Sequence, residues 1–314
     1  MSSPTVSVII PAHNAAATLQ AQLDAVAVAA AVPGAPRSEV IIVDNRSTDD
    51  TAAIAARWKA QNELPVTVVA AAERASEAYA RNVGLEHASA DLLAYCDADD
   101  KVSEGWLAAM ADALATADYA TGPLDLDSLN PDWLRATRGQ TSFDRRALFA
   151  GTVPYAHGAN MGFRRQALVD LGGFDESIAI GADVDIAVRA WESGIDLHFA
   201  DDAVVAYRLR DSLRGLWRQG RSYGLHRPAF QRRVRHLTTA PSVWPAYAKR
   251  AVWLVRHAPL LPLSRARRAN WLWVASQLSG ELQARISPTN RQPRRPEPNH
   301  RTGIGAHSHR TPTP

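Results

Sequence analysis

Four short apolar runs in the first hundred residues each stop at polar or acidic residues, and this alternation most limits the fold. The runs "TVSVII", "EVIIVD", "VTVVAA" and "DLLAYC" are rich in β-branched residues, which is typical of strands buried on both faces of a sheet. Helical patterns separate them; one, "STDDTAAIAARWKAQ", should begin after Ser47 or Thr48 as its N-cap. Strands that alternate with helices predict an α/β fold with a mostly parallel sheet.

Polar residues follow three of these predicted strands. Pro11 and Asn14 follow the first, Asp44 ends the second, and Asp97 and Asp99 follow the fourth. Ligands of open parallel sheets bind beyond the carboxyl ends of the strands. We therefore expect these residues to lie along one edge of the sheet.

The stretch "CDADD" gathers Asp97, Asp99 and Asp100 at the end of a buried strand. Alternate strand residues face the same side, so Asp97 and Asp99 would share a side if the strand continued. Mg²⁺ prefers oxygen ligands and is typically held by one or two carboxylates together with substrate phosphates. A solvated loop with a helix-capping acid is the alternative, and the pattern alone leaves both interpretations open.

The other candidates also have ordinary structural alternatives. Asp44 can accept hydrogen bonds from a ribose or a nucleobase, or belong to a turn in "NRSTDD". Asn14 can simply cap the first helix, and Arg81 can be an exposed helix residue instead of a diphosphate contact. Asp183 and Asp185 begin a predicted helix, where the helix dipole favours acids, but a carboxylate there can also be a general base.

Charge divides the chain in two. Residues 1–207 contain 14 Lys and Arg against 29 Asp and Glu, whereas the remainder contains 21 against 3. We expect a catalytic domain over residues 1–210, with loops in 118–156. A basic helical region rich in Trp and Arg should follow over 211–286, and then a disordered tail over 287–314.

The basic region has three interpretations. Trp, Leu and Arg mixed in "AKRAVWLVRHAPLLPLSRARRANWLW" are typical of helices that lie on an anionic membrane surface. The same residues can instead pack on the catalytic domain, and a basic surface can also bind nucleic acid, which we consider unlikely because no nucleic-acid module is recognisable. No run of about 18 apolar residues is present, so we expect no spanning helix.

Several classes of protein are excluded. The sequence has no G-x-G-x-x-G after a strand, no P-loop, no C-x-x-C and no G-x-S-x-G. Its single cysteine, Cys96, rules out an internal disulfide and fits a reducing compartment. Because no signal peptide is visible, we expect a cytoplasmic protein that associates with the inner face of the cell membrane.

Five segments, in this order, together resemble family 2 glycosyltransferases: "VSVIIPAHNAAATL", "VIIVDNRSTDDT", "ARNVGLEHASADLLAYCDADD", "NMGFRRQALVDLGGFDE" and "GADVDIAVRAWESG". The resemblance covers about residues 5–210. It implies the GT-A fold, a Rossmann-like and mostly parallel sheet flanked by helices, here with a C-terminal helical extension. It also implies an inverting hexosyltransferase that moves a sugar from a UDP-, GDP- or dTDP-sugar to a hydroxyl of a cell-envelope glycan or lipid-linked acceptor.

The resemblance also assigns roles to individual residues. Asp183 would be the catalytic base, and Asp99, with Asp97, would bind Mg²⁺ or Mn²⁺ in a D-x-D motif. Donor binding falls to Pro11, Asn14, Asp44, Arg81, Asp97 and Arg208.

The sequence departs from the family pattern at three places. Ala182 stands where a Glu usually precedes the base, and Asn45 stands where Asp is frequent. Arg208 and Arg210 occupy the stretch in which many members have a His. An Arg can hold a diphosphate but cannot ligate a cation, so the third protein ligand of the metal stays open. These departures keep two alternatives: a non-catalytic nucleotide-sugar-binding protein and a basic nucleic-acid-binding or scaffold protein.

Overall fold

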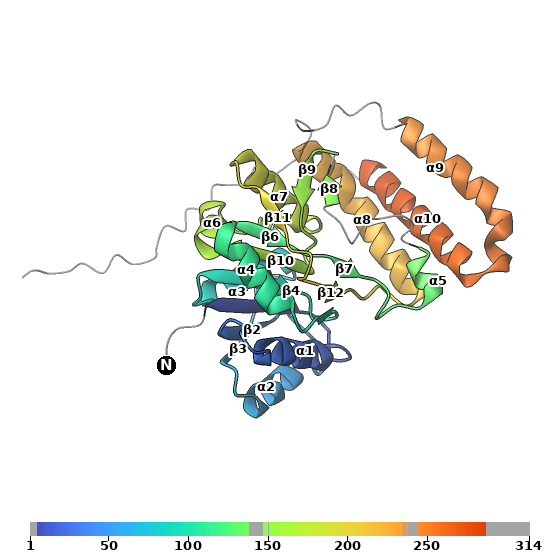
Figure 1. Ribbon diagram of the computed structural model, residues 1–314. Coiled ribbons are helices and arrows are strands. Elements are labelled where there is room, and N and C mark those ends of the chain that lie inside the picture. Colours follow the sequence, from blue (N-terminus) through green and yellow to red (C-terminus); the bar gives the residue numbers. More distant parts are fainter. Residues whose placement is uncertain (1–4, 138–146, 150, 235–236, 238–243, 287–314) are drawn as a thin grey trace, which may run out of the picture.

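A twisted seven-stranded sheet forms the centre of the computed structural model, which describes residues 5–137, 147–149, 151–234, 237 and 244–286 (Figure 1). The strand order is β11-β6-β10-β4-β1-β2-β3. Only β10 runs antiparallel to its neighbours within this sheet, so the mostly parallel sheet is confirmed. The strands are β1 (Val6–Ala12), β2 (Ser38–Asp44), β3 (Val66–Ala70), β4 (Leu92–Cys96), β6 (Tyr119–Thr121), β10 (Asn160–Arg164) and β11 (Leu197–Phe199).

Helices cover both faces of this sheet. Alternate residues of β1 belong to different apolar clusters: Val8 and Ile10 face one side, and Ile9 faces the other. The first side is covered by α1 (Leu19–Ala31), α2 (Thr51–Gln61) and α4 (Trp106–Thr116). The second is covered by α3 (Glu77–His87), α6 (Arg165–Asp170) and α7 (Ala182–Glu192). The α/β prediction is therefore confirmed.

The segment 118–156 contains more regular structure than the sequence indicated. Besides β6 it includes β7 (Leu124–Asp125), α5 (Asp132–Arg135), β8 (Ala147–Phe149) and β9 (Val153–Tyr155). A small sheet of β5 (Lys101–Val102), β12 (Val205–Ala206) and β7 lies beside the main one, and β8 pairs with β9. The expected loops are present between these segments, for example at residues 126–131, but the strands themselves were not predicted, because each has only two or three residues and shows no period.

The start of α2 also differs from the prediction. The helix begins at Thr51 and not after Ser47 or Thr48. Those two residues instead contact the loop after β1, where Asn14 donates from its backbone to the Ser47 hydroxyl and accepts from the Thr48 backbone. Tertiary hydrogen bonds thus replace the expected cap.

The basic region is helical where it is described. It consists of α8 (Leu213–Arg233), α9 (Trp244–His257), the 3₁₀ helix η2 (Ala258–Leu263) and α10 (Arg265–Ile286). Glycines let α8 and α10 approach closely, since a Cβ at Gly224 would overlap the carbonyl oxygen of Gln277. Figure 1 shows α8 and α10 side by side, with α9 farther from the sheet. Among the described residues, no helix has the length and apolar character needed to cross a membrane. The predicted tail over 287–314 lies outside the described residues.

Candidate functional site

Two adjoining cavities open at the carboxyl edge of the parallel strands. The smaller has a volume of about 530 Å³ and the larger about 830 Å³. Asp97 and Arg210 line both, so the two cavities meet at the end of β4. Of the predicted site residues, the smaller cavity is lined by Pro11, Asn14, Asp97, Asp99 and Arg208, and the larger by Arg81, Asp97 and Asp183.

Asp44 is the exception among the predicted site residues. It ends β2 as expected, but it lines neither cavity. Its carboxylate accepts a hydrogen bond of 3.2 Å from the backbone of Ser47. Here the turn interpretation of "NRSTDD" describes its contacts.

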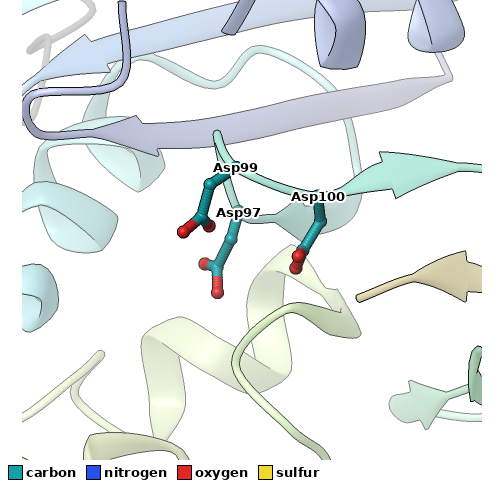
Figure 2. Close-up of side chains that lie close together, drawn as sticks. All are labelled: Asp97, Asp99 and Asp100. Carbon is teal, nitrogen blue, oxygen red and sulfur yellow. The ribbon is translucent and has the colours of Figure 1, made fainter. Parts of the chain in front are cut away.

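The three acids after β4 form one cluster, which we call the acid loop (Asp97, Asp99 and Asp100). Each offers an oxygen within 4.8 Å of the others. Figure 2 shows the carboxylates of Asp97, Asp99 and Asp100 pointing to the same side of the loop, with Asp100 directly before the next strand, β5. The strand does not continue through these acids, since β4 ends at Cys96, but the turn that follows it brings all three together.

The acid loop holds Asp100 in a buried position and Asp97 and Asp99 in partly buried ones. Burial raises the pKa of Asp100 to about 9, and the charges of Asp97 and Asp99 act in the same direction. Partial burial, followed by the charge of Glu77, raises the pKa of Asp97 to about 7, against an opposing effect of Arg81. The protein thus keeps acids together where their ionised forms are unfavourable.

Arginines provide the positive charge beside these acids. Nη1 of Arg210 lies 2.8 Å from Oδ2 of Asp99, and the Arg208 side chain donates to the backbone oxygen of Asp99 at 2.9 Å. Arg81 is buried, with 2% of its side chain exposed; it pairs with Glu77 and lies 3.5 Å from Asp97. Arg81 is therefore not the exposed helix residue that the alternative interpretation suggested.

A buried glutamine on α1 fixes both ends of the acid loop. The Gln22 side chain donates to the backbone oxygen of Asp97 at 2.9 Å and accepts from the backbone of Val102 at 3.0 Å. Gln22 has no exposed surface. The loop therefore cannot separate its acids without breaking these bonds.

The oxygen atoms of the acid loop fit a divalent cation. Oδ1 of Asp100 accepts a hydrogen bond of 2.7 Å from the backbone of Arg208. Oδ2 of the same carboxylate is buried and has no hydrogen-bond partner. A buried unpaired carboxylate oxygen is unfavourable, and carboxylate oxygens are the ligands that Mg²⁺ and Mn²⁺ prefer. Asp100 is thus the candidate for the ligand that the sequence left open.

The departure at Asn45 has a structural reason. Asn45 is buried, and its amide donates to the backbone oxygens of Ala71 at 2.8 Å and Arg74 at 2.7 Å. Its oxygen accepts from the backbone of Ser76 at 3.1 Å. An aspartate cannot donate to two carbonyls, so here an amide connects the ends of β2 and β3 to the start of α3.

Asp183 lies at the start of α7 and faces the larger cavity. Its Oδ2 accepts from the backbone of Gly158 at 3.3 Å, and its Oδ1 accepts from the backbone of Val184 at 2.9 Å. Asp185, by contrast, is buried and pairs with Arg189 at 2.9 Å and Arg233 at 2.7 Å. Asp185 therefore has a structural environment, and Asp183 is the acid left facing open space.

Several residues of the larger cavity escaped the sequence analysis. His157 lines it near Asp183, and burial lowers the pKa of this histidine, so it is neutral at pH 7. One face of α8 closes the opposite wall with Arg218, Gln219, Ser222 and Tyr223, spaced three or four residues apart. Ala182, which stands where a Glu is usual, is buried in the apolar cluster of α7 and also lines this cavity. A helical spacing of polar residues was visible, but nothing indicated that α8 covers the site.

Comparison with known proteins identifies the family. The pattern described as "Glycosyl transferase family 2" matches residues 7–172 of the chain. The chain belongs to this family. A second pattern, "Glycosyl transferase family group 2", matches residues 92–280, and so it extends through α8 and most of α10.

Relatives of this glycosyltransferase are moderately similar in sequence. Glycosyltransferase AglE of Haloferax volcanii is 28% identical over 211 residues, 66% of this chain and 68% of that protein. An uncharacterised glycosyltransferase of Mycobacterium bovis is 30% identical over 223 residues, 68% of this chain and 94% of that protein. The match to the pre-mycofactocin glycosyltransferase of Mycobacterium tuberculosis, 32% identical, spans only 31% of that longer protein.

Solved structures confirm the GT-A type of fold for the glycosyltransferase. A mannosyltransferase of Pyrobaculum calidifontis, solved with GDP-Man and Mn²⁺, has a TM-score of 0.62 at 22% identity, over 91% of this chain and 88% of that one. Glucosyl-3-phosphoglycerate synthase of Mycobacterium tuberculosis, solved with Mn²⁺, UDP and phosphoglyceric acid, has a TM-score of 0.54 at 20% identity, over 76% and 80%. The protein is a nucleotide-sugar-dependent glycosyltransferase, as predicted.

Proposed function

We propose that the enzyme binds a nucleotide sugar in the smaller cavity and transfers the sugar to an acceptor hydroxyl in the larger one. The observation that carries this proposal is that Asp97 and Arg210 line both cavities. The diphosphate would lie at that shared boundary. The transferred sugar would then face Asp183 across the larger cavity.

Different donor-binding residues would contact different parts of the nucleotide. Pro11 and Asn14, in the loop after β1, line the smaller cavity and would contact the nucleoside. Asp44 would contact the base, although it requires the ligand to reach past the cavity wall to the end of β2. Arg81 and Arg208 would neutralise the diphosphate, since both already lie beside the acid loop.

The acid loop would hold the divalent cation through Asp97, Asp99 and Asp100. Mn²⁺ is favoured over Mg²⁺ because Mn²⁺ is bound in both neighbouring structures described above. When bound, such a cation polarises phosphate oxygens and stabilises the negative charge of a departing diphosphate. Nη1 of Arg210 already places a positive charge 2.8 Å from Oδ2 of Asp99.

Asp183 would be the general base of a single displacement. Two backbone hydrogen bonds orient its carboxylate toward the larger cavity. The acceptor oxygen would lose its proton to Asp183 and attack the anomeric carbon from the side opposite the diphosphate. The configuration of the transferred sugar is thereby inverted.

The acceptor would be a cell-envelope glycan or a lipid-linked glycan. Support comes from α8, which brings the basic region of 211–286 onto the wall of the larger cavity. We assign residues 1–210 to catalysis and residues 211–286 to acceptor binding and to contact with the inner face of the membrane. The protein would then work where lipid-linked acceptors are found.

Thermal-shift binding and turnover of Asp183→Asn test this proposal together. UDP, GDP and dTDP, each with and without Mn²⁺ or Mg²⁺, should identify one nucleotide that stabilises the fold when the cation is present. Asp183→Asn should retain that stabilisation and lose about 10²- to 10⁴-fold in kcat, the usual contribution of a general base. Asp196→Asn, an exposed acid after the same helix, is the matched control. Normal turnover of Asp183→Asn would exclude Asp183 as the base.

A further inference from the structure

One face of α9 and the following η2 exposes apolar and basic side chains together. Val252, Val255 and Leu263 are 57%, 74% and 65% exposed. Lys249 and Arg256 are also exposed and, at helical spacing, lie on the same face of α9 as Val252. We call these five residues the α9–η2 surface.

The opposite face of α9 is fixed to α10. Nη1 of Arg250 lies 2.7 Å from the buried carboxylate of Glu281, and the indole of Trp271 donates to the backbone oxygen of Leu254 at 2.9 Å. The Arg285 side chain donates to the hydroxyl of Tyr247 at 3.1 Å. These contacts turn one face of α9 toward α10. The face that carries Val252 and Val255 is therefore turned toward solvent.

The exposed charges carried by residues 244–286 have one sign. Glu281 is the only acid between residues 244 and 286; it is buried and lies within ion-pair distance of Arg227 and Arg250. Every exposed charged side chain in that range is therefore basic. They are Lys249, Arg256, Arg265, Arg267, Arg268 and Arg285.

We propose that the α9–η2 surface lies flat on a membrane surface that contains anionic lipids. The valines and the leucine would enter the boundary between head groups and acyl chains, and the basic residues would contact the lipid phosphates. This inference rests on the proposed membrane contact of residues 211–286 and names the face and the lipid charge that produce it. The face of α8 that lines the larger cavity would remain turned toward that cavity.

The composition of the surface favours lipid over two other partners. A second copy that docked through the same surface would bring like charges together, because the surface carries no exposed acid. A nucleic acid would neutralise the basic residues but leave the exposed valines in water. Only an anionic lipid surface accommodates both the apolar and the basic side chains.

Sedimentation of the full-length protein with vesicles tests the proposal. Vesicles of pure phosphatidylcholine and of an equimolar mixture of phosphatidylcholine and phosphatidylglycerol are the two probes. The wild-type protein should bind the mixed vesicles much more tightly than the neutral ones. Val252→Asp/Val255→Asp should abolish binding, and Lys249→Gln/Arg256→Gln should weaken it about tenfold or more, since each basic residue near an anionic surface contributes about fivefold.

Matched controls exist on the catalytic domain. Val28→Asp/Val169→Asp replaces two valines that are 49% and 44% exposed on α1 and α6. Arg57→Gln/Lys59→Gln removes two exposed charges of α2. Both control pairs should bind the mixed vesicles like the wild type.

The outcomes separate this inference from the proposed function. Nucleotide binding is measured on each variant by thermal shift. A variant that still binds the nucleotide is folded, and if it no longer binds the vesicles it supports the proposed membrane contact of the α9–η2 surface. Equal binding to both vesicle types, or full binding by Val252→Asp/Val255→Asp, would overturn the inference. The inference would also be overturned if the wild type formed a dimer without vesicles, or bound a nucleic acid, and only Val252→Asp/Val255→Asp abolished that association. Loss of nucleotide binding by the wild type would instead count against the proposed function.

Discussion

Replacing Asp100 by asparagine measures the repulsion within the acid loop. In the folded protein burial raises the pKa of Asp100 from 3.8 to about 9. The folded state therefore keeps a proton that the unfolded state releases, and stability falls as pH rises between those two values, by about 1.4 kcal/mol per pH unit. At pH 7 the accumulated loss is on the order of 4 kcal/mol as an upper limit. Asparagine carries no charge at any of these pH values and keeps the acceptor for the Arg208 backbone.

Urea unfolding with a chelator present is the assay, at several values between about pH 5 and pH 8. The unfolding free energy of Asp100→Asn should exceed that of the wild type by a margin that widens with pH. Adding Mn²⁺ should close the gap, because only the wild type has the full set of carboxylates. Asp201→Asn, at an exposed position, should follow the wild type. Parallel pH profiles for wild type and Asp100→Asn would refute the reasoning.

Three further substitutions probe the same edge of the sheet. Asn45→Asp should lower the unfolding free energy by about 2–4 kcal/mol in urea titrations, because two buried carbonyls lose their donor and face a carboxylate. Gly158→Ala should weaken nucleotide binding and cost about 1–3 kcal/mol of stability, because the new Cβ would overlap Nη2 of Arg81; an unchanged affinity would contradict this. Arg210→Gln should tighten Mn²⁺ binding in calorimetry up to about fivefold by removing a competing cation from Asp99, and weaker binding would show that Arg210 organises the site instead.

The sequence could predict the four strands β1 to β4 but not the short strand β6. Strands β1, β2, β3 and β4 have five to seven residues each, and their continuous β-branched or apolar runs identify them. Strand β6 has only the three residues Tyr119–Thr121, held between β10 and β11. Such a strand is defined by its neighbours and leaves no local pattern.

The candidate site was predictable where one strand end supplies it. Asp97, Asp99 and the loop after β1 follow from strand positions alone. The partners that come from distant segments were not predictable: Gln22 reaches the acid loop across 75 residues, and the Gly158 backbone meets Asp183 across 25. Their residue types are ordinary, and only the packing of helices on the sheet brings them to the site.

Because Gln22 holds both ends of the acid loop, it links the stability of the cation-free protein to the affinity of that protein for a cation. A loop free to open would relax its repulsion in the absence of a cation and would have to close again to bind one. Here the closed geometry is kept by α1, so the conformational entropy of closure is lost during folding and not during binding. Substituting Gln22 should therefore lower the affinity for the cation, and it should also lower the unfolding free energy because two buried hydrogen bonds are lost. We therefore expect the first helix of the fold to influence the cation affinity of the candidate site at the end of the fourth strand.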